Sequence, residues 1–172
     1  MMVVIAIILA LASISFFPYT YYMQRASVER SIDTLGQSWV LAHKDIRNGK
    51  MYDEQSTANK LLVFRVGSDS VEQYLYTGAV VPETATLSSN PSIIQDKNIE
   101  FDSNVEILSF SGVGVGESDV LVYSISAPYA VGVFSTGSTT FSSTGVFVTL
   151  GYDGASQDSG RARQILLRPY LQ

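Results

Sequence analysis

The first 24 residues form an apolar stretch without charge. They contain no Asp, Glu, Lys or Arg, and the first twelve are apolar throughout. As a helix, this segment would be about 36 Å long, enough to cross a bilayer core of about 30 Å. Pro18 lies inside the pattern, where a proline removes a backbone hydrogen bond and predicts a kink. The segment 1–24 is therefore predicted to be an apolar helix, kinked at Pro18, of membrane-spanning length.

After residue 24 the pattern changes to a single apolar stripe. Its members follow one another at alternating intervals of four and three residues, and they are Val28, Ile32, Leu35, Trp39, Ala42 and Ile46. This spacing is that of one face of an amphipathic helix, and Asn48-Gly49 is typical of a helix C-terminus. We expect residues 25–50 to continue the first helix and to dock through the stripe on a sheet of the same chain. His43 is expected at the boundary of the stripe.

Beyond residue 50 the pattern predicts short strands separated by turns. Two of them flank the turn Gly67–Ser70, and this arrangement predicts a hairpin. The predicted strands are Lys60–Val66, Val71–Gly78, Ile99–Phe101, Val105–Phe110, Val120–Ser126, Ala130–Phe134, Val146–Tyr152 and Gln164–Leu167. No second long helical period occurs, so residues 51–172 are predicted to form an antiparallel sheet or small β-sandwich. The expected fold class is α+β, with one long helix packed on this β-rich domain.

Composition and charge exclude several kinds of site. The chain has no cysteine and a single histidine, which excludes disulfides, thiolate metal sites and any site that needs a histidine pair. The net charge of −5 is uneven: residues 25–50 carry +2, residues 51–160 carry −10 and the last twelve residues carry +3. An acidic globular part is a poor match for nucleic acid, which favours a basic face. Opposite charges on the helix and the globular part would suit copies that pack side by side.

The N-terminal segment resembles that of a known family. Residues 2–8, MVVIAII, are similar to the interior of the N-terminal helix of type IV pilins and of the pseudopilins of type II secretion. That helix commonly contains a proline about four turns further along, which Pro18 matches. Residues 35–49, LGQSWVLAHKDIRNG, resemble the helix end in minor pseudopilins. The resemblance covers about the first fifty residues, and after that it concerns architecture alone.

One part of the family pattern is absent from this sequence. Mature chains of the family begin with an N-methylated Phe and reach a glutamate before the apolar run. Aligning Pro18 or Ala6 predicts that four or five mature residues, these two among them, precede Met1.

The resemblance implies a structural role rather than an enzymatic one. It implies a bacterial cell-surface filament of identical copies, assembled from subunits that wait in the inner membrane and are handled by a pilus or secretion machinery. Adhesion, motility, DNA uptake and secretion are all compatible with it, and no cofactor is expected. The residues expected first in the membrane and then in the filament core are Met1, Met2, Val3, Val4, Ile5, Ile7, Ile8, Leu9, Leu11, Ile14, Phe16 and Phe17.

Other interpretations of the apolar stretch remain open. Ala10-Leu11-Ala12 fits the small residues of a signal-peptidase site, although no basic region precedes it. A single-span anchor would instead hold a monomeric β-rich domain that binds a ligand. The upstream coding sequence would discriminate these interpretations, because the filament interpretation predicts a short basic leader ending in Gly.

The loops offer few candidates for chemistry. Asp153 and Asp158 lie in one turn-rich loop and could provide oxygen ligands for calcium, but the spacing is not that of an EF-hand and a solvated loop is the simpler interpretation. The glycine-rich run 111–119 lacks the lysine of a phosphate-binding loop. The Ser/Thr-rich run 135–145 is expected to be a flexible loop or weak edge strand, and exposed hydroxyls there could carry glycans.

Overall fold

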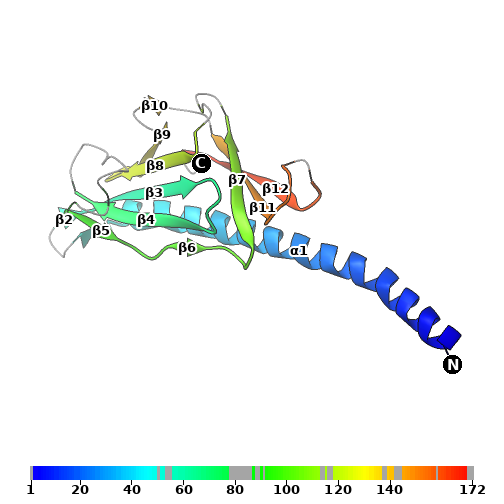
Figure 1. Cartoon of the computed structure of the whole chain (residues 1–172). Coiled ribbons are helices and arrows are strands. Elements are labelled where there is room, and N and C mark those ends of the chain that lie inside the picture. Colours follow the sequence, from blue (N-terminus) through cyan, green and yellow to red (C-terminus); the bar gives the residue numbers. More distant parts are fainter. Residues whose placement is uncertain are drawn as a thin grey trace.

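A single long helix lies along one side of a β-rich globular part (Figure 1). The structure is a computed structural model, and it describes residues 2–49, 51–52, 56–77, 87, 90, 92–112, 115, 118–136, 139–141, 145–157 and 159–169. Within these, the side chains of residues 2, 3, 6, 8–15, 17, 51, 52, 56, 57 and 139–141 lie outside the description. The N-terminal part of the helix projects beyond the globular part, and the C-terminal part runs beneath the strands.

Helix α1 spans Met2–Arg47 without interruption, which makes it about 69 Å long. Pro18 is exposed inside it. Figure 1 shows α1 as one continuous, curved ribbon, so the proline does not interrupt the helix. A proline removes only its own amide hydrogen bond, and the remaining bonds on both sides keep the helix continuous.

The end of α1 agrees with the sequence prediction. The amide of Asn48 donates to the carbonyl of Lys44 at 2.8 Å, and the amide of Gly49 donates to that of Ile46 at 3.1 Å. Gly49 has a φ of 76°, in the left-handed region that a glycine adopts without penalty. Lys44 and Arg47 occupy the last turn, where positive charge complements the helix dipole.

The strands among the described residues form three antiparallel sheets. The largest has the order β10-β9-β8-β3-β4-β5, with β6 also paired to β4; a second has the order β12-β11-β7; and β1 pairs with β2. The strands are β1 (Met51–Tyr52), β2 (Ser56–Thr57), β3 (Asn59–Arg65), β4 (Ser70–Tyr76), β5 (Ile93–Gln95), β6 (Ile99–Glu100), β7 (Val105–Ser111), β8 (Val120–Ser126), β9 (Val131–Thr136), β10 (Thr139–Phe141), β11 (Val146–Tyr152) and β12 (Ala162–Leu167).

Each strand predicted from the sequence is present, and the predicted hairpin at Gly67–Ser70 joins β3 to β4. Strands β1, β2, β5 and β10 were not predicted. They have two or three residues each, too few for an alternation of apolar and polar positions to appear.

The β3–β4 turn connects the two larger sheets. The amide of Gly67 donates to the carbonyl of Ile107 in β7 at 2.8 Å, and the amide of Ile107 donates to the carbonyl of Ser68 at 3.0 Å. These two bonds occupy the edge of β7 that β11 leaves open. The two sheets therefore lie side by side over the same helix.

The main core lies between α1 and the sheets, and a second one lies on the opposite face of the large sheet. Strand β3 contributes to both, because Leu62 and Phe64 face the helix while Leu61 and Val63 face away from it. All four are completely buried. Because both faces of β3 are buried, its sequence is a continuous apolar run rather than an alternation of apolar and polar residues.

Candidate functional site

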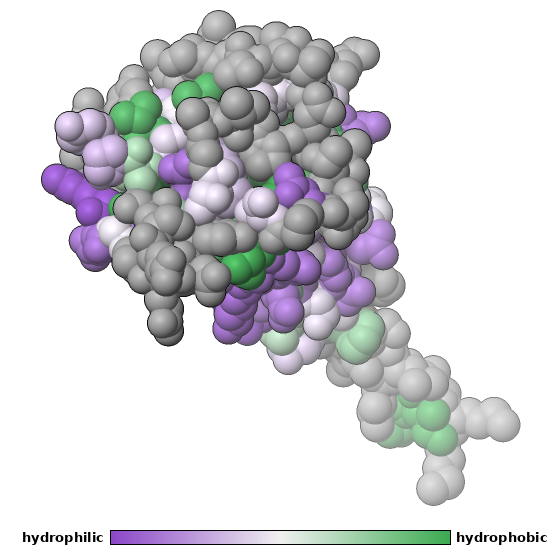
Figure 2. Space-filling model, turned by 90° about the vertical axis from the view of Figure 1, so that its left-hand side faces the viewer, coloured by the Kyte–Doolittle hydropathy of each residue, from purple (hydrophilic) through white to green (hydrophobic). Residues whose placement is uncertain are grey.

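The N-terminal part of α1 carries apolar side chains that nothing in the described chain covers. Val4, Ile5, Ile7 and Phe16 expose between 54% and 64% of their surface. Figure 2 shows hydrophobic surface at the far end of the helix, away from the globular part. An apolar helix surface of this kind is stable only when another apolar surface or lipid covers it.

Not all of the residues predicted for this segment can be placed. Met1 lies outside the described residues, and so do the side chains of Met2, Val3, Ile8, Leu9, Leu11, Ile14 and Phe17. Among the parts of the chain that the structure describes, we find no helix that is both long and apolar enough to cross a membrane.

Tyr21, about two turns before the first residue of the apolar stripe, already contacts the globular part. The hydroxyl of Tyr21 occupies the space that a Cβ at Gly160 would need, so the loop before β12 approaches the helix closely there. The side-chain oxygen of Gln24 accepts a hydrogen bond from Arg161 Nη1 at 3.3 Å. Residues 2–20 are named the projecting segment below, and residues 21–47 are named the docked segment.

The docked segment places the predicted stripe in the core. Trp39 is 5% exposed, Ile32 is partly buried, and the other stripe residues are at most 1% exposed: Val28, Leu35, Ala42 and Ile46. The stripe packs against both sheets, with β12 and β11 on one side and β6, β3 and β8 on the other. The sheet-docking face of α1 was therefore readable from spacing alone.

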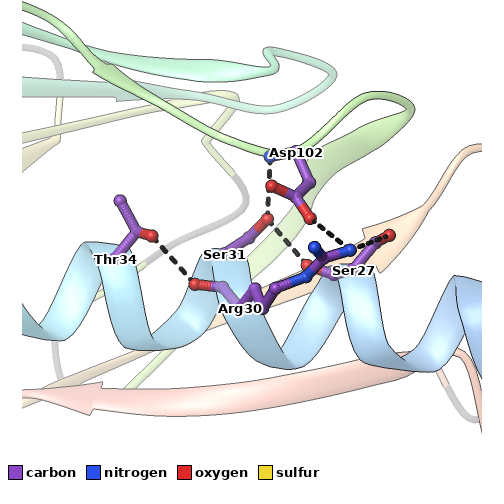
Figure 3. Close-up of polar contacts among 5 residues, drawn as sticks. All are labelled: Ser27, Arg30, Ser31, Thr34 and Asp102. Atoms are coloured by element: carbon purple, nitrogen blue, oxygen red, sulfur yellow. Dashed lines mark hydrogen bonds and ion pairs between the residues drawn. The ribbon is translucent and has the colours of Figure 1, made fainter.

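A polar clamp fastens the docked segment to the loop after β6 (Figure 3). The hydroxyl of Ser31 is 1% exposed; it donates to the carbonyl of Ser27 at 2.9 Å and accepts from the amide of Asp102 at 3.0 Å. Arg30 Nη2 lies 3.0 Å from the Asp102 carboxylate on the exposed side. Thr34 makes the same bond to the previous turn, to the carbonyl of Arg30, but it is exposed.

The largest buried cluster joins the helix to the C-terminal segment. The indole of Trp39 donates to the carbonyl of Arg168 at 3.2 Å, and the hydroxyl of Tyr123 donates to the carbonyl of Pro169 at 2.7 Å. Trp39 stacks on Phe134 and packs at a tilt on Tyr123. The helix, β8 and the residues after β12 are thereby held at one point.

His43 belongs to this cluster, so the expectation that it lies at the boundary of the stripe is wrong. It is 2% exposed, and its Nε2 is 3.1 Å from the Tyr123 hydroxyl. Burial lowers the pKa of His43, while a hydrogen bond with the backbone of Ala130 acts in the opposite direction. Burial also raises the pKa of Tyr123 well above its usual value. The ring is a structural element of the core, and its position is unsuited to a solvent-exposed base.

Lys60 is a buried cation that the sequence did not reveal. It is 4% exposed in β3, and its Nζ lies 3.1 Å from the carboxylate of Asp96 and 3.5 Å from that of Asp45 on the helix. The three charges form one wall of a cleft of about 430 Å³ between α1 and the β4–β6 edge. Burying an ammonium group costs free energy unless carboxylates pair with it, as Asp96 and Asp45 do here. The burial of Lys60 was hard to predict from the sequence, because Lys60 is the first residue of an otherwise apolar run.

Only one of the two calcium candidates lies within the described residues. Asp153 is exposed in the turn after β11, where its amide donates to the carbonyl of Asn104 at 2.7 Å. Asp158 lies outside the described residues. Across the described part of the chain, no group of three or more His, Cys, Asp or Glu residues is arranged to hold a metal ion.

No protein-family model matches the chain, and comparisons with curated proteins and with solved structures gave no significant match.

Proposed function

We propose that this protein is a structural subunit of a pilus-like filament on the bacterial cell surface, and that α1 forms the core of the filament. The observation that carries the proposal is the contrast within α1: the docked segment is packed on the sheets, while the projecting segment exposes Val4, Ile5, Ile7 and Phe16. A helix that projects from its own domain with apolar side chains needs a partner to cover them.

Copies of the same helix would provide that cover. Bringing an Ile or Val from about half exposed to buried contributes roughly 1 kcal/mol per side chain. The predicted core segment holds about a dozen large apolar residues, so side-by-side packing of several copies would stabilise an assembly. Because each copy presents one surface to the next without closing a ring, the assembly is a helical polymer.

The proposal also includes the state before assembly. Residues 1–24 carry no charge, and we propose that this segment lies in the inner membrane until a pilus or secretion machinery extracts it. The β-rich part then remains outside the core and faces solvent, where it serves adhesion, motility, DNA uptake or secretion.

One experiment tests the proposal with the full chain. Ile7→Glu places a charge on the projecting segment, and Ile94→Glu places the same charge on the similarly exposed edge strand β5. Each variant is expressed in cells that assemble the filament, or purified in detergent that is then removed, and electron micrographs are examined for fibres. We expect fibres from the wild type and from Ile94→Glu, and none from Ile7→Glu.

The thermal unfolding of both variants in detergent serves as the control for folding. Neither side chain is in the core, so both variants should unfold within a few degrees of the wild type. Wild-type chain that stays monomeric after detergent removal would instead favour a membrane-anchored or secreted monomeric β-rich domain. Fibres of Ile7→Glu that match the wild type would also contradict the proposal.

A further inference from the structure

The sheet β12-β11-β7 has one face that α1 does not cover. Ile165 of β12 packs on the helix at Gly36. Because side chains alternate along a strand, the neighbours of Ile165 and its partner Val148 point the opposite way. The residues that face away from the helix form two cross-strand pairs, Phe147 with Leu166 and Thr149 with Gln164, of which Thr149 is itself buried at 1% exposure.

A groove of about 780 Å³ runs across this outer face and the adjoining loops. Its polar lining comes from four separate parts of the fold: Ser109 and Ser111 on β7, Asp119 before β8, Gln157 in the loop between β11 and β12, and Gln164 on β12. The volume is in the range of sites that hold small ligands.

Most of these polar side chains have no partner within the described part of the chain. The side chains of Ser109, Ser111, Asp119 and Gln157 make no hydrogen bond or ion pair there. Gln164 donates to the hydroxyl of Thr149 at 3.3 Å, which fixes its amide at the edge of the groove. The groove therefore presents hydroxyl and amide groups that donate and accept hydrogen bonds, together with a carboxylate that accepts them.

An exposed aromatic ring lies beside these polar groups. Phe147 is 41% exposed on the central strand, directly opposite Ser111 of the groove on one side and Leu166 on the other. Opposite residues in an antiparallel pair have Cβ atoms about 5 Å apart. The Phe147 ring is thus placed to form a flat apolar platform next to the hydrogen-bonding groups.

The chemistry of the groove rules out several ligand classes. Among the described residues that line it there is no Lys or Arg, and the one charged group is the carboxylate of Asp119, which would repel phosphates and acidic sugars. At Ile107 the edge of β7 is bonded to the β3–β4 turn, which takes the place of an added peptide strand at that residue. The free polar groups would be left unpaired by a lipid chain.

We propose that this groove binds a neutral carbohydrate. The C–H face of a pyranose ring packs on Phe147, and the ring hydroxyls exchange hydrogen bonds with the serines, the glutamines and Asp119. Hydroxyl groups that both donate and accept match this lining better than any class excluded above. The proposal does not depend on polymerisation, because the groove lies within one chain.

The test uses the full chain as a monomer in detergent micelles without a sugar headgroup. Four neutral hexasaccharides are titrated up to 10 mM by NMR: β-1,4-linked glucose, β-1,4-linked N-acetylglucosamine, β-1,4-linked mannose and α-1,4-linked glucose. We expect at least one to bind with a dissociation constant of about 1 mM or lower. No binding of any of the four would overturn the proposal, and so would a neutral peptide or an oligonucleotide that competes for the same site.

Variants locate the binding to the groove. Phe147→Ala should weaken binding about tenfold, and Phe147→Trp should retain it, because the platform requires an aromatic ring. Tyr129→Ala is the matched control, since Tyr129 is 84% exposed beyond the far end of β8, about 20 Å along the strand from Asp119. Equal loss in Phe147→Ala and Tyr129→Ala, or no loss in Phe147→Ala, would place the site elsewhere and contradict the assignment.

These outcomes are separate from those of the filament experiment. A chain that binds sugar in micelles but never polymerises would contradict the filament proposal alone. A chain that polymerises but binds none of the four sugars would contradict only the carbohydrate site.

Discussion

The two segments of α1 are parts of one uninterrupted helix, yet they differ in what covers their apolar side chains. In the docked segment the apolar residues form one stripe, and two sheets of the same chain cover it. In the projecting segment, charge is absent all around the helix, and the described apolar side chains stay exposed. A stripe can be satisfied by one flat partner, whereas a helix that is apolar all round needs partners on every side. The distribution of polar residues along α1 therefore determines which kind of partner each segment needs.

The largest expected difference between the segments concerns the stability of the folded chain. Trp39→Ala removes the central ring of the buried cluster and its bond to Arg168, and it should lower the free energy of unfolding by about 3–5 kcal/mol. Phe16→Ala removes a ring that is 64% exposed, and it should change that free energy by less than about 0.5 kcal/mol. Urea unfolding of both variants in detergent is followed by circular dichroism, because Trp39 is the only tryptophan.

If Trp39→Ala and Phe16→Ala lowered the free energy of unfolding by the same amount, the division of α1 into two segments would be contradicted. A large loss for Phe16→Ala alone would mean that the projecting segment folds back on the globular part.

The sequence predicted this division well because it depends on local periodicity. The stripe, the uncharged segment and the glycine after the helix are all patterns within a few turns. The burial of His43 and Lys60 was not predictable in the same way. Each has a partner far along the chain, Tyr123 for His43 and Asp96 for Lys60.

The groove was hidden from the sequence for a similar reason. Ser109, Gln157 and Gln164 are ordinary polar residues of separate strands and loops, and only the register of β11 with β7 and β12 brings them to one face. The loop containing Asp119 is a glycine-rich run in the sequence. It contributes to the groove through its position relative to β7. Which strands become neighbours depends on the whole fold, so the meeting of these residues is not visible in the pattern of any one strand.

A smaller effect tests how the docked segment is fastened at its flank. Ser31→Ala removes the acceptor for the partly buried amide of Asp102 (Figure 3) and should lower the free energy of unfolding by about 1–2 kcal/mol. Thr34→Ala removes an equivalent hydrogen bond to the previous turn. The Thr34 hydroxyl has no hydrogen-bond partner outside the helix in the described structure, so this substitution should change the free energy of unfolding by less than about 0.5 kcal/mol. Urea unfolding measures both, and equal costs would show that the clamp to Asp102 contributes nothing.

The smallest expected effect is a pH dependence that belongs to the docked segment alone. Burial lowers the pKa of His43 below its usual 6.5 in the folded chain. As pH falls below about 6.5, the unfolded chain therefore binds a proton at His43 before the folded chain does. Stability is complete above that pH, and it decreases as pH falls toward the folded pKa, with a slope of at most about 1.4 kcal/mol per pH unit.

This slope can be isolated because His43 is the only histidine, and ordinary carboxylates titrate mostly below about pH 5. The free energy of unfolding is measured between pH 7.5 and 5.5 for the wild type, His43→Phe and Tyr123→Phe. His43→Phe should abolish the decrease, whatever its effect on stability at pH 7.5. Tyr123→Phe keeps the buried histidine and should retain the decrease. A wild type whose stability is flat, or rises, as pH falls through 6.5 would show that the His43 ring is not held uncharged in the core, and that the junction between α1, β8 and the C-terminal segment is more open than the structure describes.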